Sequence, residues 1–160
     1  MKVLINSLSL VILAAAMGRA VAADCPVTEP GNVQFGNDAL HVVLPQDKRF
    51  VFAADSPGFR DQHGALGIKV GWVRKIQGQL EITGRRLDAQ APKLRAWISD
   101  GYGDTGFQTS YVIFPTPGCW EIVGSVAQHQ LVFVVEVELV APGPSWRLRG
   151  PEAGWRETGG

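Results

Sequence analysis

Two short connections in this sequence concentrate the side chains that could do chemistry. The string GRRLDAQAP carries the adjacent arginines Arg85 and Arg86, and the string SDGYGDTG carries Asp100 and Asp104. Guanidinium groups are planar forks that match carboxylates and phosphates, so the arginines are candidates for binding an anion. The alternative is structural, because either arginine could pair with Asp88 or Asp104 and hold a loop. Loops on a rigid scaffold often carry function, so we expect any functional site here.

Asp100 and Asp104 are also the weak candidates for a metal site. They lie four residues apart in a glycine-rich turn, and calcium loops take carboxylate and carbonyl oxygens from such turns. A calcium loop usually has a third carboxylate and a glutamate further along, and no such glutamate follows here. A turn in which the aspartates bond to their own backbone explains the segment better. We therefore predict no bound metal and no other cofactor.

Aromatic residues form a second group of candidates, because exposed rings favour the binding of glycans or peptides. Those considered for a surface platform are Trp72, Trp97, Tyr102, Phe107 and Tyr111. Trp97 alternates with Ala96 and Ile98, which places it beside Arg95 on the outer face of a strand. The alternative is that a loop or a second sheet covers this face and buries Trp97. The predicted binding set is Arg85, Arg86, Trp97 and Tyr102.

The histidines give no support for catalysis. His41 lies in an expected strand, His63 in a loop and His129 in a turn, so the sequence does not group them. A catalytic nucleophile needs a base within hydrogen-bond reach and a group that orients the base. The sequence also lacks the common serine-hydrolase, zinc-protease and nucleotide-binding motifs. We predict that the protein is not an enzyme and has no catalytic residues.

Residues 1–23 have the order of a secretory signal peptide. Lys2 supplies the positive charge, residues 3–13 are mostly apolar, and small residues follow up to Ala23. The apolar run is too short for a membrane-spanning helix. Cleavage at this point would start the mature chain near Asp24 and export the protein to the periplasm or the extracellular space.

Cys25 leaves a second interpretation of the N-terminus open. A lipoprotein signal places a small residue directly before the lipidated cysteine, but Asp24 occupies that position. A lipid on Cys25 would be the protein's one link to a membrane. In an exported protein, Cys25 and Cys119 are first interpreted as a disulfide. The alternative is two independent thiols.

Eight short segments show the alternation of β-strands at a spacing of roughly ten residues, and no helical pattern follows the signal. They are 40–44, 49–53, 68–76, 80–83, 94–98, 107–114, 120–126 and 131–139. This pattern predicts an all-β fold, an antiparallel immunoglobulin-like β-sandwich over 24–140. A small barrel is the alternative. Residues 141–160 have no periodicity and many glycines and prolines, and are predicted to form a disordered tail.

The clearest strand pair is a hairpin within 114–140. Apolar residues alternate on both of its strands, so one face of the hairpin is expected to be buried, with Trp120 in the core. Cys119 has the opposite parity and should not face that core, unlike the cysteines of antibody domains. A second hairpin with a polar tip is predicted from 40–44 and 49–53.

Four longer strings carry a resemblance. They are CPVTEP, GWVRKIQGQLEITG, GRRLDAQAPKLRAWISDGYGDTGFQTS and FPTPGCWEIVGSV. From about Cys25 to Val137 the chain resembles a family of small secreted or lipid-anchored bacterial proteins, some of which have an immunoglobulin-like domain. The resemblance implies an exported β domain and brings no activity and no catalytic residues. In such proteins the early cysteine can carry a lipid, and Asp24 departs from that pattern.

These observations predict a non-catalytic, exported binding or interaction module of the bacterial cell envelope. Its partner would be an envelope protein or a glycan. The alternative is a glycan- or small-ligand-binding domain that uses exposed aromatics and arginines. Nucleic acid is not expected as a partner: of the 15 basic residues two lie in the signal, which leaves 13 against 15 acidic residues.

Overall fold

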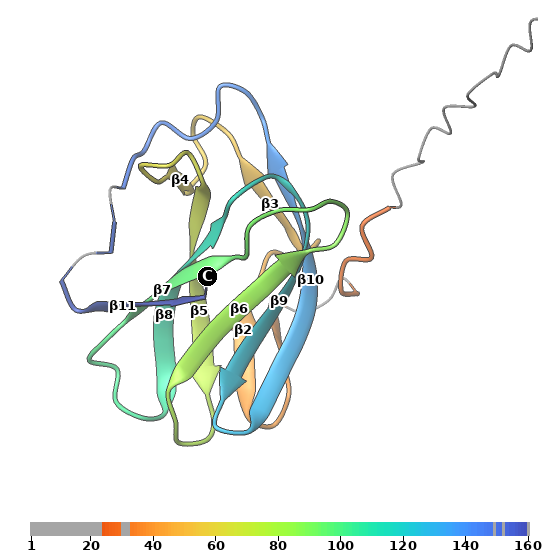
Figure 1. Cartoon of the computed structure of the whole chain (residues 1–160). Coiled ribbons are helices and arrows are strands. Elements are labelled where there is room, and N and C mark those ends of the chain that lie inside the picture. The colour runs from red at the N-terminus through yellow and green to blue at the C-terminus, as the bar shows by residue number, and fades with distance from the viewer. Residues whose placement is uncertain (1–23, 30–32, 149, 152, 160) are drawn as a thin grey trace, which may run out of the picture.

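Two β-sheets packed face to face make up the part of the chain that the computed structural model describes, residues 24–29, 33–148, 150–151 and 153–159 (Figure 1). The predicted signal peptide, 1–23, lies outside the described residues. Within them, no helix has the length and apolar character that a membrane crossing needs. The predicted all-β sandwich is confirmed.

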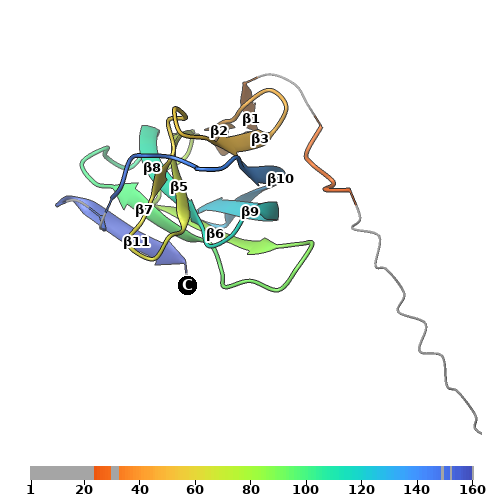
Figure 2. The ribbon, with the colours of Figure 1, turned by 90° about the horizontal axis from the view of Figure 1, so that it is seen from above.

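The larger sheet has seven strands in the order β1-β2-β5-β8-β7-β11, and β4 pairs with the start of β5. Its strands are β1 (Gln34–Gly36), β2 (Leu40–Val43), β4 (Phe59–Arg60), β5 (Leu66–Arg74), β7 (Arg95–Ser99), β8 (Gly106–Phe114) and β11 (Trp155–Gly159). The smaller sheet has the order β3-β10-β9-β6. Its strands are β3 (Arg49–Phe52), β6 (Leu80–Arg86), β9 (Gly118–Val126) and β10 (His129–Leu139). Figure 2 looks down on the two layers.

The expected central hairpin is β9 paired with β10 in antiparallel register, with Trp120 opposite Val135. The apolar side chains of the hairpin face the other sheet, and Trp120 is completely buried in the main core. Phe133 of β10 meets Trp72 of β5 across the core, with ring centroids 6.0 Å apart. The alternation therefore identified the buried face of this hairpin correctly.

The predicted hairpin of 40–44 and 49–53 is wrong. β2 lies in the larger sheet beside β5, whereas β3 lies in the smaller sheet and pairs with β10 in parallel. The chain thus crosses between the sheets at 44–48. An alternating pattern shows which face of a strand is buried, but it does not name the neighbouring strand.

The expectation of a disordered tail over 141–160 is wrong for the described part of that segment. Residues 144–148 and 153–159, called the C-terminal strap below, run along the seven-stranded sheet (dark blue in Figure 1) and end in β11 beside β7. A second apolar cluster lies beneath the strap. It contains Phe59, Ala65, Trp97, Tyr111 and Ile113, with Leu148 and Trp155 of the strap against it. Burial of these large rings stabilises the segment although its sequence has no periodicity.

β11 also connects the two sheets. Its backbone pairs with β7, while the side chains of Arg156 and Thr158 donate hydrogen bonds to the carbonyl oxygens of Leu80 (2.8 Å) and Ile82 (3.3 Å) in β6. These carbonyls lie on the edge of the smaller sheet. The strap therefore covers an edge that would otherwise present unpaired backbone groups.

Candidate functional site

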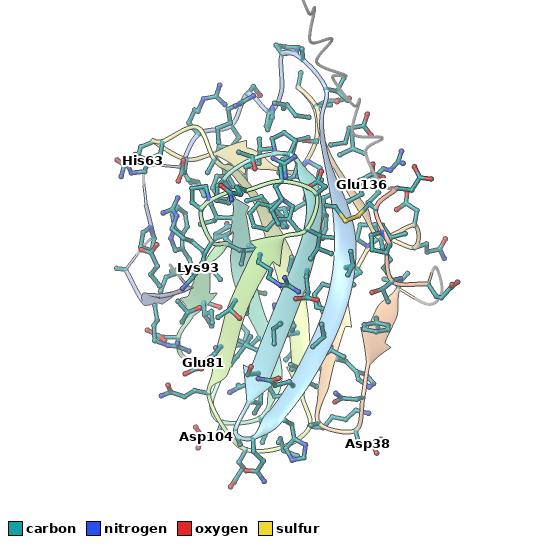
Figure 3. The ribbon with its side chains drawn as sticks, turned by 45° about the vertical axis from the view of Figure 1, so that its right-hand side comes forward. Asp38, His63, Glu81, Lys93, Asp104 and Glu136 are labelled. Atoms are coloured by element: carbon teal, nitrogen blue, oxygen red, sulfur yellow. A yellow bond between two sulfur atoms is a disulfide. The ribbon has the colours of Figure 1, made fainter. Side chains whose placement is uncertain are left out.

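The two connections singled out from the sequence do not form one site. The loop of Asp100 and Asp104 lies at the end of the sandwich that holds the β5–β6 turn, where Gly78 N–H donates to the Asp104 carbonyl (3.1 Å). In Figure 3, Asp104 lies at the lower end and His63 near the upper end. Leu80 borders the aspartate loop, and Arg86 lies at the other end of β6, about 20 Å along an extended strand.

A buried arginine organises the aspartate loop. The guanidinium of Arg74 donates to the carbonyl oxygens of Gly78 (2.8 Å), Gly103 (2.8 Å), Tyr102 (3.3 Å) and Thr105 (3.5 Å). Arg74 is only 2% exposed. Burial lowers its pKa, and the charge of Asp104 acts in the opposite direction. Arginine side chains are not deprotonated in proteins, so Arg74 remains a cation at neutral pH.

Arg74 also explains why the loop resembles a metal site. The guanidinium of Arg74 bonds to a cluster of backbone carbonyl oxygens, which are the kind of ligand that a calcium ion takes from such a turn. Three glycines of the loop, Gly101, Gly103 and Gly106, have positive φ angles, so the glycines are required by the backbone conformation. No cluster of three or more acidic, histidine or cysteine side chains suited to a metal occurs in the described residues. The loop thus holds a protein cation of its own.

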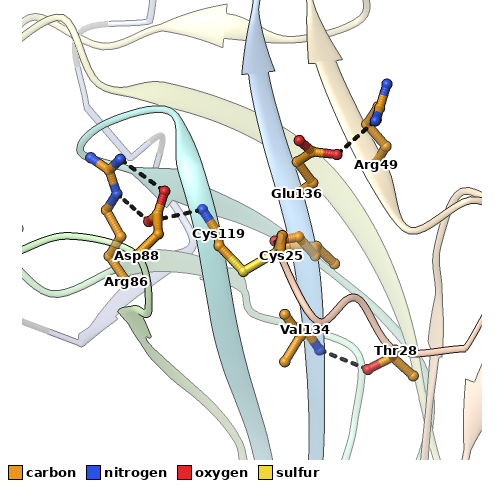
Figure 4. Close-up of a disulfide and its surroundings, with 9 residues drawn as sticks. Cys25, Thr28, Arg49, Arg86, Asp88, Cys119, Val134 and Glu136 are labelled. Carbon is orange, nitrogen blue, oxygen red and sulfur yellow. Dashed lines mark hydrogen bonds and ion pairs between the residues drawn. A yellow bond between two sulfur atoms is a disulfide. The ribbon is translucent and has the colours of Figure 1, made fainter. Parts of the chain in front are cut away.

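Arg86 has the structural role that was the alternative to anion binding. Its Nε and Nη2 donate to the two carboxylate oxygens of Asp88 (2.7 and 3.2 Å), and Nη1 donates to Thr116 Oγ1 (3.1 Å). Asp88 in turn accepts the backbone N–H of Cys119 (3.1 Å), as Figure 4 shows. All three nitrogens of its guanidinium thus have partners within the fold, which favours the structural role of Arg86 over anion binding.

The Asp88 carboxylate should make stability depend on pH. The hydrogen bond from Arg86 lowers the pKa of Asp88, the bond from Cys119 N–H adds to this, and desolvation opposes both. A carboxyl group with a lowered folded-state pKa stabilises the fold above its unfolded pKa of about 3.9, and this stability is lost as the pH falls through the folded pKa. We expect Asp88→Asn to cost about 1 kcal/mol at pH 7 and much less near pH 2, by urea unfolding.

Asp38→Asn is the matched control for this loss of charge, because Asp38 is exposed and lies at the other end of the molecule (Figure 3). A difference between wild type and Asp88→Asn that stayed constant from pH 7 to pH 2 would contradict the assigned role.

The Cys25–Cys119 disulfide is formed, with Cα atoms 5.4 Å apart. It joins the N-terminal segment to the start of β9, and Figure 4 shows it beside β10. Thr28 continues the attachment: its N–H donates to the Val134 carbonyl (3.0 Å), and its Oγ1 accepts the Val134 N–H (2.8 Å). Cys119 lies on the outer side of β9, as its parity predicted. A Cys25 engaged in this bond has no thiol left for a lipid.

Trp97 does not belong to an exposed binding surface. It lies on the outer face of β7, as its parity indicates, but only 2% of it is exposed, because the strap covers this face. Its ring stacks on Phe59 with centroids 5.8 Å apart. Trp72 is completely buried in the main core, and Tyr111 is buried beneath Trp155 at a centroid distance of 4.8 Å. The expectation that Trp97 lies exposed on the outer face is therefore wrong.

Tyr102 and Phe107 remain at the surface. They are 39% and 51% exposed, and their rings contact each other at a centroid distance of 6.2 Å with 64° between their planes. The Phe107 ring lies over Gly71 of β5, where an added Cβ would approach it to 2.9 Å. Val43 of β2, 37% exposed, lies on the far side of Gly71. These three side chains are called the aromatic corner below.

Arg85 lies elsewhere, on the outer face of the smaller sheet. Its Nε donates to Glu121 Oε1 of β9 (2.8 Å), and its side chain is 69% exposed. An open groove of about 430 Å³ surrounds this pair. Of the four residues in the predicted binding set, Tyr102 and Arg85 are thus accessible, at separate places.

The histidines are not assembled into a catalytic group. His41 lies in β2, His129 begins β10, and His63 lies in the turn between β4 and β5. Among the described residues, a histidine ring makes one hydrogen bond, between His63 Nε2 and the Gln62 amide nitrogen (3.2 Å). The absence of an enzymatic function stays a prediction.

Arg74 is the residue that sequence reasoning missed. A signal was present, because Arg74 shares the parity of Val70 and Trp72 and so falls on the buried face of its strand. A charged residue at a buried position is rarely tolerated without partners, which should have directed attention to it. Phe107 was considered for the platform but left out of the binding set, although it is the most exposed of the five aromatics considered.

No protein-family model matches this sequence, and no curated protein matches it. The resemblance to exported bacterial proteins therefore stays a prediction.

Proposed function

We propose that this protein is an exported, non-catalytic interaction module of the bacterial cell envelope, which binds an extended polypeptide segment at the aromatic corner. One observation carries the proposal: Tyr102 of the loop between β7 and β8 and Phe107 of β8 are exposed, and their rings contact each other. Exposed aromatic pairs of this kind are characteristic of the energetic centres of protein interfaces.

The rigidity of the corner supports a binding role. Arg74 fixes the carbonyl of Tyr102, and the Tyr102 hydroxyl lies 3.5 Å from Thr109 Oγ1 on β8. Phe107 is part of β8 itself. Because these rings are held before a ligand arrives, binding would cost little conformational entropy.

The C-terminal strap indicates what kind of ligand this face accepts. The outer face of β8 presents Phe107, Thr109, Tyr111 and Ile113 in succession, and the strap covers its Tyr111 end. Trp155 and Leu148 of the strap pack there, with the chain extended along the sheet. The aromatic corner continues the same face without a cover. A polypeptide with apolar and aromatic side chains fits this surface for the same reasons as the strap.

Export is supported by the Cys25–Cys119 disulfide, which is compatible with an oxidising compartment. Placement in the periplasm or the extracellular space belongs to the proposal. The signal-like residues 1–23 and the resemblance to exported bacterial proteins support it.

A glycan is the second candidate ligand, favoured by the surroundings of Tyr102. Tyr102 also borders a polar pocket of about 110 Å³, together with Asp100 and Asp104. Sugars stack on aromatic rings and donate hydroxyl hydrogen bonds to carboxylates, so this combination suits a small neutral sugar.

Selection of peptides distinguishes the two ligands. We expect a phage-displayed library of random peptides, panned on the oxidised protein, to yield aromatic-rich sequences. Tyr102→Ala and Phe107→Ala should each weaken the selected peptides by about tenfold or more, because truncation of a central aromatic anchor typically costs about 2 kcal/mol. Fluorescence anisotropy with labelled peptides measures this.

Val132→Ala is the matched control, because Val132 is 48% exposed on the smaller sheet. Selected peptides that bound Tyr102→Ala and wild type equally would contradict the proposal. The second candidate would be favoured if the library yielded no peptides and a glycan array gave a signal that Tyr102→Ala removes. Thermal melts check that each variant is folded.

A further inference from the structure

The groove around Arg85 is separate from the aromatic corner. It has a volume of about 430 Å³ and lies on the outer face of the smaller sheet, against the connection that precedes β7. Its lining includes Thr83 and Arg85 of β6, Lys93 of the connection, and Glu121 and Val123 of β9. Figure 3 shows Lys93 on this side of the molecule, between His63 and Glu81.

Arg85 is oriented within this groove. Its Nε–Glu121 hydrogen bond (2.8 Å) fixes one edge of the planar guanidinium. Its Nη1 and Nη2 have no hydrogen-bond partner among the residues that the structure describes, and the side chain is 69% exposed. An exposed ion pair of this kind contributes little to stability. The fold therefore does not need Arg85, and its two terminal nitrogens are available to a planar acid group.

The charges and surfaces of the groove narrow the ligand class. Arg85 gives its Nε to Glu121, and its two terminal nitrogens favour one planar anionic group. The Thr83 hydroxyl and the Glu121 carboxylate can bond to ligand hydroxyls, and the half-buried Val123 offers apolar surface to carbon-bound hydrogens. A ligand with one carboxylate, several hydroxyls and an apolar ring face satisfies all of these groups.

We propose that this groove binds a sugar carboxylate of the hexuronic acid class, whose carboxylate is held by Arg85. Two N–H groups of one guanidinium match two carboxylate oxygens, so the contact is selective in geometry as well as in charge. This proposal goes beyond the polypeptide site, since the groove and the aromatic corner share no residue and lie on different sheets. Either can fail while the other holds.

The test is an NMR titration of the ¹⁵N-labelled, oxidised protein with glucuronate, galacturonate, glucose and succinate. We expect saturable shifts of the amides of β6 and β9 with at least one uronate, and none with glucose at the same concentrations. Arg85→Gln should weaken uronate binding by about tenfold or more, because it removes a charge-assisted pair of hydrogen bonds. Arg85→Lys keeps the charge but loses the planar fork of the guanidinium. Its affinity for uronate should fall between those of the wild type and Arg85→Gln.

Arg49→Gln is the matched control. Arg49 lies on β3 of the same sheet, is 45% exposed and pairs with Glu136 (2.8 Å), so the change in net charge is the same at a different place. It should leave uronate binding unchanged. Equal binding of succinate and the uronates would overturn the sugar assignment. The site would be overturned if Arg49→Gln and Arg85→Gln lost uronate affinity equally, or if no uronate gave saturable shifts.

Discussion

Replacing Cys25 and Cys119 together by alanine is expected to lower the free energy of unfolding by about 4–5 kcal/mol. The disulfide spans a sequence separation of 94 residues. In the chain-entropy description, a cross-link that closes a loop of this length lowers the conformational entropy of the unfolded chain, and this raises the free energy of unfolding by about that amount. The native state loses little else, because Thr28 still holds the N-terminal segment to Val134. Urea unfolding of the oxidised wild type and the double variant measures the difference.

The reduced wild type is the natural control, since it should unfold at nearly the same urea concentration as the double variant. A difference below about 1 kcal/mol between the oxidised and reduced forms would show that the bond does not constrain the unfolded chain as described. The double variant should keep the fold and the exposed Tyr102 and Phe107. Peptide binding at the aromatic corner should therefore survive in it.

Replacing Arg74 by alanine is expected to cost about 3–5 kcal/mol. The change removes a buried cation that bonds to four carbonyl oxygens, two of them at 2.8 Å. Hydrogen bonds to charged groups contribute about 1.5–3 kcal/mol each, and removal of one partner from a buried network typically costs about 3–5 kcal/mol. Some of the carbonyls lie in an exposed loop and regain water, which keeps the loss within this range.

The loop should also lose its order in this variant. We expect faster hydrogen exchange in residues 100–105 and weaker binding of peptides selected at the aromatic corner, since Arg74 fixes the carbonyl of Tyr102. Arg49→Ala, which removes an exposed ion pair, should cost less than about 1 kcal/mol and serves as the control. An Arg74→Ala variant as stable as Arg49→Ala would refute the role assigned to Arg74.

The sequence predicted much of the fold because alternation is a local property. The period of two along 120–126 and 131–139 identified the buried faces of β9 and β10 and placed Trp120 in the core. The same parity put Cys119 outside that core, and the structure joins it there to Cys25. Each of these conclusions follows from side-chain direction within one strand.

Strand ends and strand partners were less predictable. β6 was expected to stop at Thr83, so Arg85 and Arg86 were assigned to one connection. Pairing with β9 continues β6 to Arg86, and adjacent residues of a strand point to opposite sides. Arg85 therefore lies in the open groove, while Arg86 reaches Asp88. The parity argument applies to them only once the strand is known to include both.

The candidate sites depended on contacts between distant parts of the chain. Trp97 has the parity of an outer-face residue, and the strap, which no pattern revealed, decides that it is buried. Arg74 fills the aspartate loop, which the sequence alone left as a weak metal candidate. The sequence by itself determined eight of the strand segments and the face that most of their side chains take, because alternation depends on local geometry. Only the tertiary structure decided which faces stay exposed and which charges find partners, because burial depends on segments brought together by the fold.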